Sequence, residues 1–195
     1  AFIVSFFLRN HTAQLAELSA AVGLKPLGFV ALVLGIVAGV AGATGTMLGG
    51  YLSDRFGGRD LRFNMTMPAF ATLASIPFYV FGLLTADLIV ALVVLAIPPI
   101  LNTLWYGPVF ATVQGLVRPE TRATAAAILL FVINIIGLGL GPLGIGIISD
   151  LMAEGLGLGA NEGLRWSLIV FYVVGASAYV LFWLARRTIR EEMVS

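Results

Sequence analysis

Five long stretches of the sequence contain no Asp, Glu, Lys or Arg, and this feature constrains the fold more than any other. The stretches are 27–52, 63–86, 88–117, 123–149 and 166–185. Because a helix needs about 20 apolar residues to cross the hydrocarbon core of a bilayer, each stretch is long enough to span a membrane. The ten-residue alternating segments of a transmembrane β-barrel are not seen. The sequence therefore predicts an all-α membrane protein.

The composition excludes several other classes of protein. Of the 195 residues, 59% are hydrophobic and 11% are charged, which is outside the usual range for a soluble domain. The formal net charge of +1 gives no reason to expect a nucleic-acid partner. There is no cysteine, and His11 is the single histidine, so neither residue type can form a metal-binding cluster. We expect no metal, no cofactor, and the lipid bilayer as the main partner.

Basic residues alternate between the connections and predict the orientation. One side is expected to carry Arg55, Arg59, Arg62, Arg118, Arg122, Arg186, Arg187 and Arg190. The other side receives Arg9, Lys25 and Arg165 together with several carboxylates. By the positive-inside rule, the first group and the C-terminus are cytoplasmic. We expect a multi-pass protein of the cell membrane, in bacteria the inner membrane.

The segments outside the five stretches give further expectations. Residues 1–8 are apolar but too short to span, so we interpret them as the end of a truncated helix and the whole of 1–195 as a transmembrane fragment. The residues around Leu15, Leu18 and Val22 predict a short interfacial helix. The glycine-rich LMAEGLGLGANEG, residues 151–163, predicts a mobile outer loop, and His11 is expected in solvent at a helix end.

A polar segment follows the first full stretch. Residues 50–59, GYLSDRFGGR, resemble the GxLaDRxGrR signature of the major facilitator superfamily. The resemblance implies a conformational-switch motif, here called the 50–59 motif, made of Gly50, Asp54, Arg55, Gly57 and Arg59. Its carboxylate is implied to lie near the start of a neighbouring helix, around Arg122, where a helix dipole favours an anion. Gly58 stands where the signature usually has a basic residue.

Other parts of the chain carry the same resemblance. Residues 102–117, 118–142 and 144–150, and the closing ARRTIREE, are similar to the spinster branch of that superfamily. The resemblance implies the C-terminal six-helix half of the twelve-helix major facilitator fold, from the end of helix 7 to helix 12, with the first helix truncated. The partner would then be the missing N-terminal six-helix half of the same polypeptide.

The family also implies a function. It is secondary active transport, by alternating access, of a small amphiphilic or lipid-like solute, and not enzymatic catalysis. Two alternatives remain open, a non-transporting membrane scaffold and a membrane-embedded enzyme subunit. An enzyme needs acids, bases or metal ligands at membrane depth, and the five stretches offer none.

Several side chains are candidates for the site. Transporters of this kind bind near the midplane between two halves. The predicted substrate-cavity residues are Asn102, Tyr106, Phe131 and Asn134, since an amide that faced lipid would lack partners. For both amides, an interhelical hydrogen bond without substrate contact is the alternative. The gate or cap candidates are Gln114, Arg122 and Asp150.

Glycines recur at helical spacing in two of the stretches. They are Gly35, Gly39, Gly42 and Gly49 in the first, and Gly137, Gly141 and Gly144 in the fourth. Small residues let membrane helices approach closely, so we expect these glycines to lie at helix–helix contacts.

Overall fold

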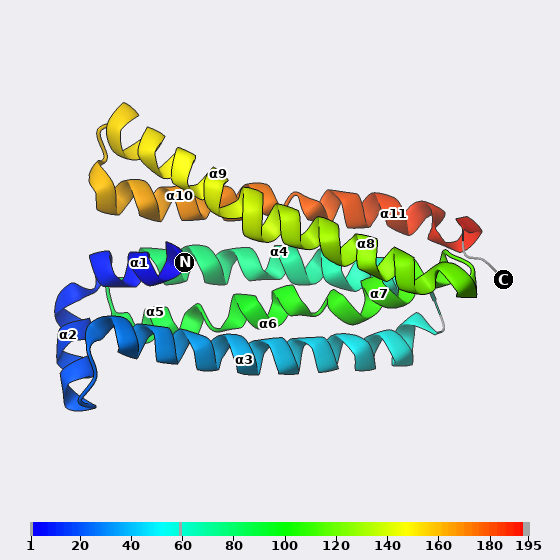
Figure 1. The fold of residues 1–195 in the computed structure, drawn as a ribbon, viewed down its shortest axis with the longest axis horizontal. Coiled ribbons are helices and arrows are strands. Elements are labelled where there is room, and N and C mark those ends of the chain that lie inside the picture. Colours follow the sequence, from blue (N-terminus) through cyan, green and yellow to red (C-terminus); the bar gives the residue numbers. More distant parts are fainter. Residues whose placement is uncertain (1, 59, 193–195) are drawn as a thin grey trace.

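The computed structural model describes residues 2–58 and 60–192, and the secondary structure of these residues is helical. Long helical segments run side by side along the longest axis of the molecule (Figure 1). The elements are α1 (Phe2–Asn10), α2 (Thr12–Ala21), α3 (Pro26–Leu52), η1 (Ser53–Gly57), α4 (Phe63–Leu84), α5 (Leu88–Val94), α6 (Ile97–Thr103), α7 (Tyr106–Gly115), η2 (Pro119–Thr121), α8 (Arg122–Asn134), η3 (Ile135–Leu140), α9 (Gly141–Asp150), η4 (Leu151–Gly155), α10 (Gly159–Gly175) and α11 (Ala178–Glu192).

Five helical segments of the described chain are long and apolar enough to cross a membrane. They are Pro26–Gly57, Phe63–Leu84, Leu88–Gly115, Pro119–Gly155 and Gly159–Ile189. The prediction of an all-α membrane fold is therefore confirmed. The first, fourth and fifth segments extend beyond the charge-free stretches because their helices continue through charged residues, whereas the second and third end two residues earlier.

Prolines accompany the breaks in the third of these segments. Short turns at residues 95–96 and 104–105 separate α5, α6 and α7. Pro98 and Pro99 stand in the first turn of α6, where a missing N–H costs least, and Pro108 occupies the first turn of α7. The fourth segment instead passes through the π-helical turn η3 just before Pro142, which has no N–H to donate. These interruptions give both segments a change of direction.

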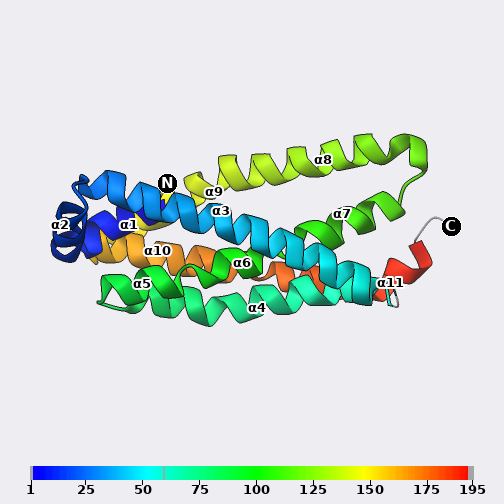
Figure 2. The same ribbon diagram turned by 90° about the horizontal axis from the view of Figure 1, so that it is seen from below.

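The connections lie at two ends of the bundle. The end of α3, the α7–α8 connection and the end of α11 lie at the right-hand end of Figure 1, while α2, the α4–α5 connection and the α9–α10 connection lie at the left-hand end. Figure 2 shows the same division from below. Most of the predicted cytoplasmic arginines thus belong to one end of the molecule.

Hydrophobic packing at the left-hand end surrounds the histidine. Phe6, Phe7, Leu15 and Leu88 are fully buried in one cluster, and the rings of Phe6 and Phe7 lie 5.8 and 5.7 Å from the His11 ring. His11 is only 4% exposed. The expectation that it lies in solvent is therefore wrong, because α2 crosses the end of the bundle (Figure 1) and the turn between α1 and α2 packs against Phe6 and Phe7.

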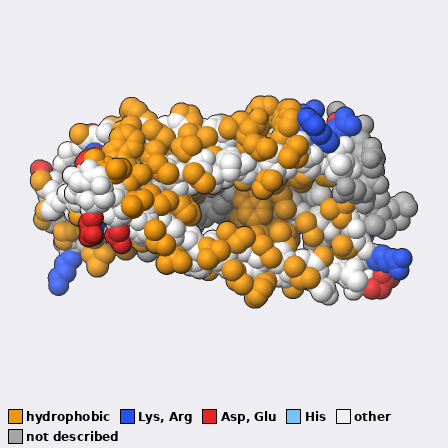
Figure 3. Space-filling view, turned by 90° about the horizontal axis from the view of Figure 1, so that it is seen from above, with side chains coloured by type: hydrophobic (Ala, Val, Ile, Leu, Met, Phe, Trp, Pro, Cys, Tyr) orange, Lys and Arg blue, Asp and Glu red, His pale blue; other side chains and the backbone are white. Residues whose placement is uncertain are grey.

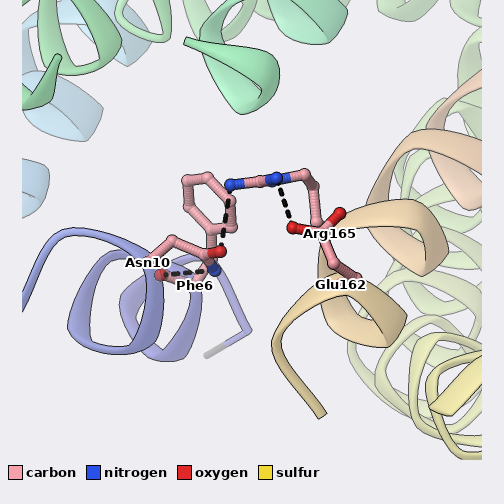
Figure 4. A network of polar contacts seen from close by, with 4 residues as sticks. All are labelled: Phe6, Asn10, Glu162 and Arg165. Atoms are coloured by element: carbon pink, nitrogen blue, oxygen red, sulfur yellow. Dashed lines mark hydrogen bonds and ion pairs between the residues drawn. The ribbon is translucent and has the colours of Figure 1, made fainter. Parts of the chain in front are cut away.

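Polar contacts join α1 to α10 at the same end. Figure 4 shows Arg165, which donates to the Asn10 side-chain oxygen at 3.0 Å and forms an ion pair with Glu162. The Asn10 amide in turn donates to the Phe6 carbonyl at 3.2 Å. The predicted short helix is also present as α2, and its Gln14 side chain accepts a hydrogen bond of 2.7 Å from the Leu88 N–H at the start of α5.

The glycine-rich segment 151–163 is mostly helical. Between η4 and α10 only residues 156–158 are outside a helix. Gly157 and Gly159 have φ of 66° and 76°, the left-handed region that glycine adopts without a steric penalty, and they complete the reversal within these few residues. The prediction of a long mobile loop is therefore wrong, since two glycines suffice for the turn.

Candidate functional site

A cavity of about 760 Å³ lies among α4, α6, α7, α8, α10 and α11. Figure 3 shows a hollow with hydrophobic side chains on its floor on the face seen from above. Most lining residues are apolar, among them Val109, Leu129, Ile133 and Phe182. Thr72, Asn102, Thr112, Tyr172 and Thr188 are the polar members of the lining. The site is thus an apolar chamber with a few hydrogen-bonding groups.

One group of polar residues, here called the polar cluster, joins three helices at the cavity. Asn102 Nδ2 donates to the Tyr172 hydroxyl at 2.6 Å, and this hydroxyl donates to Ser75 Oγ at 2.7 Å. Ser75 donates onward to the Thr72 carbonyl at 2.6 Å, one turn back in α4. The polar cluster therefore holds α4, α6 and α10 together within the membrane.

Asn102 both lines the cavity and forms an interhelical hydrogen bond, the two roles considered from the sequence. Its amide makes the interhelical hydrogen bond, and the residue also lines the cavity. Its Oδ1 atom lies 3.4 Å from Ser75 Oγ, a long contact that leaves most of its accepting capacity free. The Tyr79 ring stacks on the Tyr172 ring, with ring centres 3.8 Å apart, and this contact holds the Tyr172 side chain in place.

Thr112 is a site residue that the sequence-based reasoning missed. It is 5% exposed, it lines the cavity, and its hydroxyl has no hydrogen-bond partner among the described residues. A buried hydroxyl without a partner is costly, so it is a natural group for a ligand to bind. The sequence does contain a signal for this position. Intervals of three and four residues place four side chains on one face of the α7 segment, namely Trp105, Val109, Thr112 and Leu116.

The other three predicted cavity residues do not line this chamber. Tyr106 stacks on Trp105 at the start of α7, with ring centres 4.1 Å apart. Phe131 is 65% exposed, and the exposed Asn134 donates to the Leu130 carbonyl one turn back at 2.8 Å. This local bond shows why an amide in a membrane helix need not point inward. Contact of these three with substrate stays a prediction, and Phe131 and Asn134 lie on α8, which has no buried residue.

Residues 50–57 of the 50–59 motif are helical, because α3 continues into the π-helical turn η1. Asp54 is exposed, whereas the Arg55 guanidinium folds back onto its own helix and donates to the Tyr51 hydroxyl at 2.7 Å. Arg59 lies outside the described residues. A π-helical turn often marks a functional position in a membrane helix, and the role of Asp54 stays a prediction.

Close packing explains one glycine of the motif, Gly57. A Cβ on Gly57 would overlap the side-chain amide of Asn64, which already accepts a 2.9 Å hydrogen bond from Ser53. A Cβ on Gly107 of α7 would lie 2.8 Å from the Gly50 main chain, whereas a Cβ on Gly50 itself would meet nothing within 4 Å. Gly57 therefore allows η1 to pack directly on α4, and Gly107 allows α7 to approach α3.

The glycine stripes divide into two sets. Gly49 packs against the Leu104 carbonyl and Gly144 against the Phe171 ring, as expected for helix–helix contacts. In contrast, a Cβ on Gly35, Gly39, Gly42 or Gly137 would meet nothing within 4 Å, and the atom nearest to Gly141 is a carbonyl of its own segment. At these positions no other described helix makes the expected contact, so helix–helix packing there stays a prediction.

The gate and cap candidates lie at the two ends. Arg122 at the start of α8 donates from Nε to the Gln114 carbonyl at 3.1 Å, and this bond closes the α7–α8 connection. Asp150 is exposed at the end of α9. Within residues 2–58 and 60–192, no group of three or more acidic or histidine side chains is arranged to hold a metal ion.

Comparisons with known proteins agree with this architecture. No family model matches the sequence. The sequence is 32% identical over 169 residues to an MFS-type efflux pump of Mycolicibacterium smegmatis, a match that covers 86% of this chain and 38% of the relative. The fold matches a bacterial homolog of the human lysosomal transporter spinster, solved in an inward-facing, unoccupied conformation, with a TM-score of 0.74 and 26% identity over 100% of this chain and 47% of that chain.

The chain belongs to the major facilitator superfamily. The occupied, inward-facing form of the same spinster homolog gives a TM-score of 0.72 over 48% of its length. The described helices are thus half of a major facilitator fold of spinster-like type, and the chain spans less than half the length of the relatives it matches. It is a multi-pass membrane protein homologous to transporters.

Proposed function

We propose that this chain is the C-terminal half of a secondary active transporter that moves a small amphiphilic solute by alternating access across the bacterial inner membrane, with its C-terminus in the cytoplasm. The relative described as an efflux pump favours export as the direction. The end of the bundle that carries most of the arginines supports the cytoplasmic assignment.

The observation that carries the proposal is the chemistry of the cavity. Its volume of about 760 Å³ lies within the usual range of small-molecule sites, roughly 300 to 1,000 Å³. The apolar lining accepts a hydrocarbon part, while the Thr112 hydroxyl and the Asn102 carbonyl oxygen offer one donor and one acceptor. An amphiphile with a hydroxyl or an ester group near its apolar part matches this arrangement.

A second six-helix half is supported by the faces that this chain leaves uncovered. The open glycines lie on α3 and η3, and no residue of α8 or η3 is buried. Membrane helices associate through small residues that allow close contact. We infer that α3 and the α8–η3 segment pack against the other half, and that this contact changes during the transport cycle.

The 50–59 motif fits the same cycle. Asp54 is exposed at the end of α3, so its carboxylate is free to meet the positive end of a helix dipole in one state. The start of α8, at Arg122, is the partner we propose, and alternation between contact and release gives the two states different stabilities.

The experiment is transport of a fluorescent lysophospholipid by the reconstituted protein in liposomes. Thr112→Val removes the unpartnered hydroxyl at nearly constant shape and should raise the apparent KM, whereas Thr112→Ser should restore it. If Thr112→Val transports with an unchanged KM, the Thr112 hydroxyl does not bind the substrate. No exchange of amphiphiles under any ion gradient would reject the transporter.

A further inference from the structure

A second pocket, of about 310 Å³, lies where α4 begins and α11 nears its end. It is lined by Arg62, Trp183, Arg186 and Arg187, so three of its four side chains carry a guanidinium group. We call it the arginine pocket. The proposed transport cycle uses none of these residues.

The arginine pocket and the cavity use different faces of α11. Phe182, Ala185 and Ile189 line the cavity, whereas Trp183, Arg186 and Arg187 line the arginine pocket. The two sites have no lining residue in common. A ligand in the arginine pocket therefore does not occupy the place proposed for the transported solute.

Two of the three arginines have defined surroundings. Arg62 is the residue before the first turn of α4, and its Nε atom is buried without a hydrogen-bond partner among the described residues. The Arg186 guanidinium lies 4.5 Å from the centre of the Trp183 ring, a cation–π contact. Asp60 accepts a 3.0 Å hydrogen bond from the Arg62 main-chain N–H and is the acidic neighbour on this element.

This chemistry favours a phosphate. The planar guanidinium group offers paired N–H donors that match two phosphate oxygens, and several arginines around one small pocket neutralise its charge. The buried Nε of Arg62 is a donor that such an oxygen can satisfy. Three positive charges would repel a cation, and a neutral carbohydrate has no charge for them to neutralise.

The surroundings show which phosphate compound fits. Phe70 and Tyr179 lie beside Trp183, with ring centres 6.1 and 6.4 Å from its ring, and Phe70 is 57% exposed. An aromatic surface thus leads from the arginine pocket along α4 and α11 into the membrane spans. Free phosphate would leave this surface uncovered, whereas the acyl chains of a lipid would cover it.

We propose that the arginine pocket binds the phosphate of an anionic phospholipid from the cytoplasmic leaflet, with the acyl chains against Phe70 and Trp183. α4 begins and α11 ends at the arginine-rich end of the bundle, where the headgroups of the cytoplasmic leaflet are expected. Attraction between an anionic leaflet and such arginines is expected on general grounds, and the preformed pocket makes it site-specific.

The test uses Trp183 as the reporter. The full-length protein, with Trp105→Phe and Trp166→Phe, is placed in phosphatidylcholine nanodiscs, and subtraction of the Trp183→Phe spectrum isolates the Trp183 emission. Phosphatidylglycerol with brominated acyl chains should quench this emission at a lower mole fraction than brominated phosphatidylcholine. Arg62→Gln and Arg187→Gln should each reduce the relative association by roughly fivefold.

The controls separate the possible outcomes. Arg118→Gln removes the same charge at the same end but outside the arginine pocket, and it should leave the preference for phosphatidylglycerol unchanged. Arg187 is exposed, so its variant tests the site even where Arg62→Gln disturbs the start of α4. Equal quenching by the two lipids overturns the proposal. If equal quenching is accompanied by a change of the Trp183 emission in sodium phosphate, but not in sodium chloride of equal ionic strength, the arginine pocket binds free phosphate instead.

Discussion

At the scale of single residues, His11 shows what one buried ring contributes. Burial lowers the pKa of His11 below its ordinary value of 6.5, and the nearby Arg165 lowers it further, while Gln14, the Ala86 carbonyl and Asp87 act in the opposite direction. The neutral ring packs against Phe6 and Phe7. Protonation would place a positive charge in this cluster, so the folded protein resists it.

This pKa predicts a pH dependence of stability. Below about pH 6.5 the unfolded chain binds the proton and the folded chain does not, so stability is fully present above this value and falls as the pH drops. His11→Phe should reduce the loss of melting temperature between about pH 7 and pH 5.5. The measurement is thermal unfolding in detergent at both values, and identical pH slopes in the two proteins would contradict it.

The glycines provide a matched pair on one helix. A Cβ on Gly49 would overlap the main chain at Leu104, whereas a Cβ on Gly39 meets open space. Gly49→Ala should therefore destabilise the protein by about 1 to 3 kcal/mol through overpacking. Gly39→Ala should not destabilise this half, because alanine favours a helix. Thermal unfolding of both variants checks the prediction, and equal losses would show that the close approach of α3 and α7 is unimportant.

At the scale of elements, the sequence predicts which segments are helical but not which faces they bury. Charge-free stretches locate the five spans, and Pro98 and Pro99 locate the bend, because a missing N–H acts locally. The face of a helix depends on its neighbours, and for this reason Thr112 escaped notice. The turn at residues 104–105 also separates Asn102 from Tyr106, which a continuous helix would place on one face.

The polar cluster makes a prediction about three helices at once. Tyr172→Phe removes the hydroxyl that accepts from Asn102 and donates to Ser75. We expect a loss of about 1 to 3 kcal/mol in stability, since two polar groups lose their partner. Tyr79→Phe keeps the stacked ring and removes a hydroxyl outside the polar cluster, so it should cost less. The comparison is made by unfolding in detergent, and equal costs would count against the polar cluster as an interhelical link.

At the scale of the whole molecule, the sequence predicts the family and the number of spans, and the packing of the chain agrees with half of a larger fold. Part of the signature at 50–59 has a packing reason, because a Cβ on Gly57 would overlap the Asn64 side chain, whereas a Cβ on Gly50 would meet nothing within 4 Å. The role of Asp54 is harder to predict, both from the sequence and from the structure. A contact that switches exists in only one state of the transport cycle. The exposed Asp54 carboxylate in this conformation shows only that the contact is free to form in another.

The two-state cycle predicts a measurable shift of population. Asp54→Asn removes a carboxylate that we propose stabilises one state at the start of α8, an interaction of about 0.3 to 1 kcal/mol, so the population ratio should change by about two- to fivefold. These 195 residues contain no cysteine, so Gly39→Cys on the open face of α3 is the reporter in this half, read by the rate of maleimide labelling in liposomes, with any cysteine of the other half replaced by serine. Val22→Cys, exposed at the outer end, should label equally in both backgrounds. Glu120→Gln is the matched charge control, since it removes a carboxylate from the same end but outside the 50–59 motif. If Asp54→Asn changes neither the labelling of position 39 nor transport, the carboxylate serves only to fix topology.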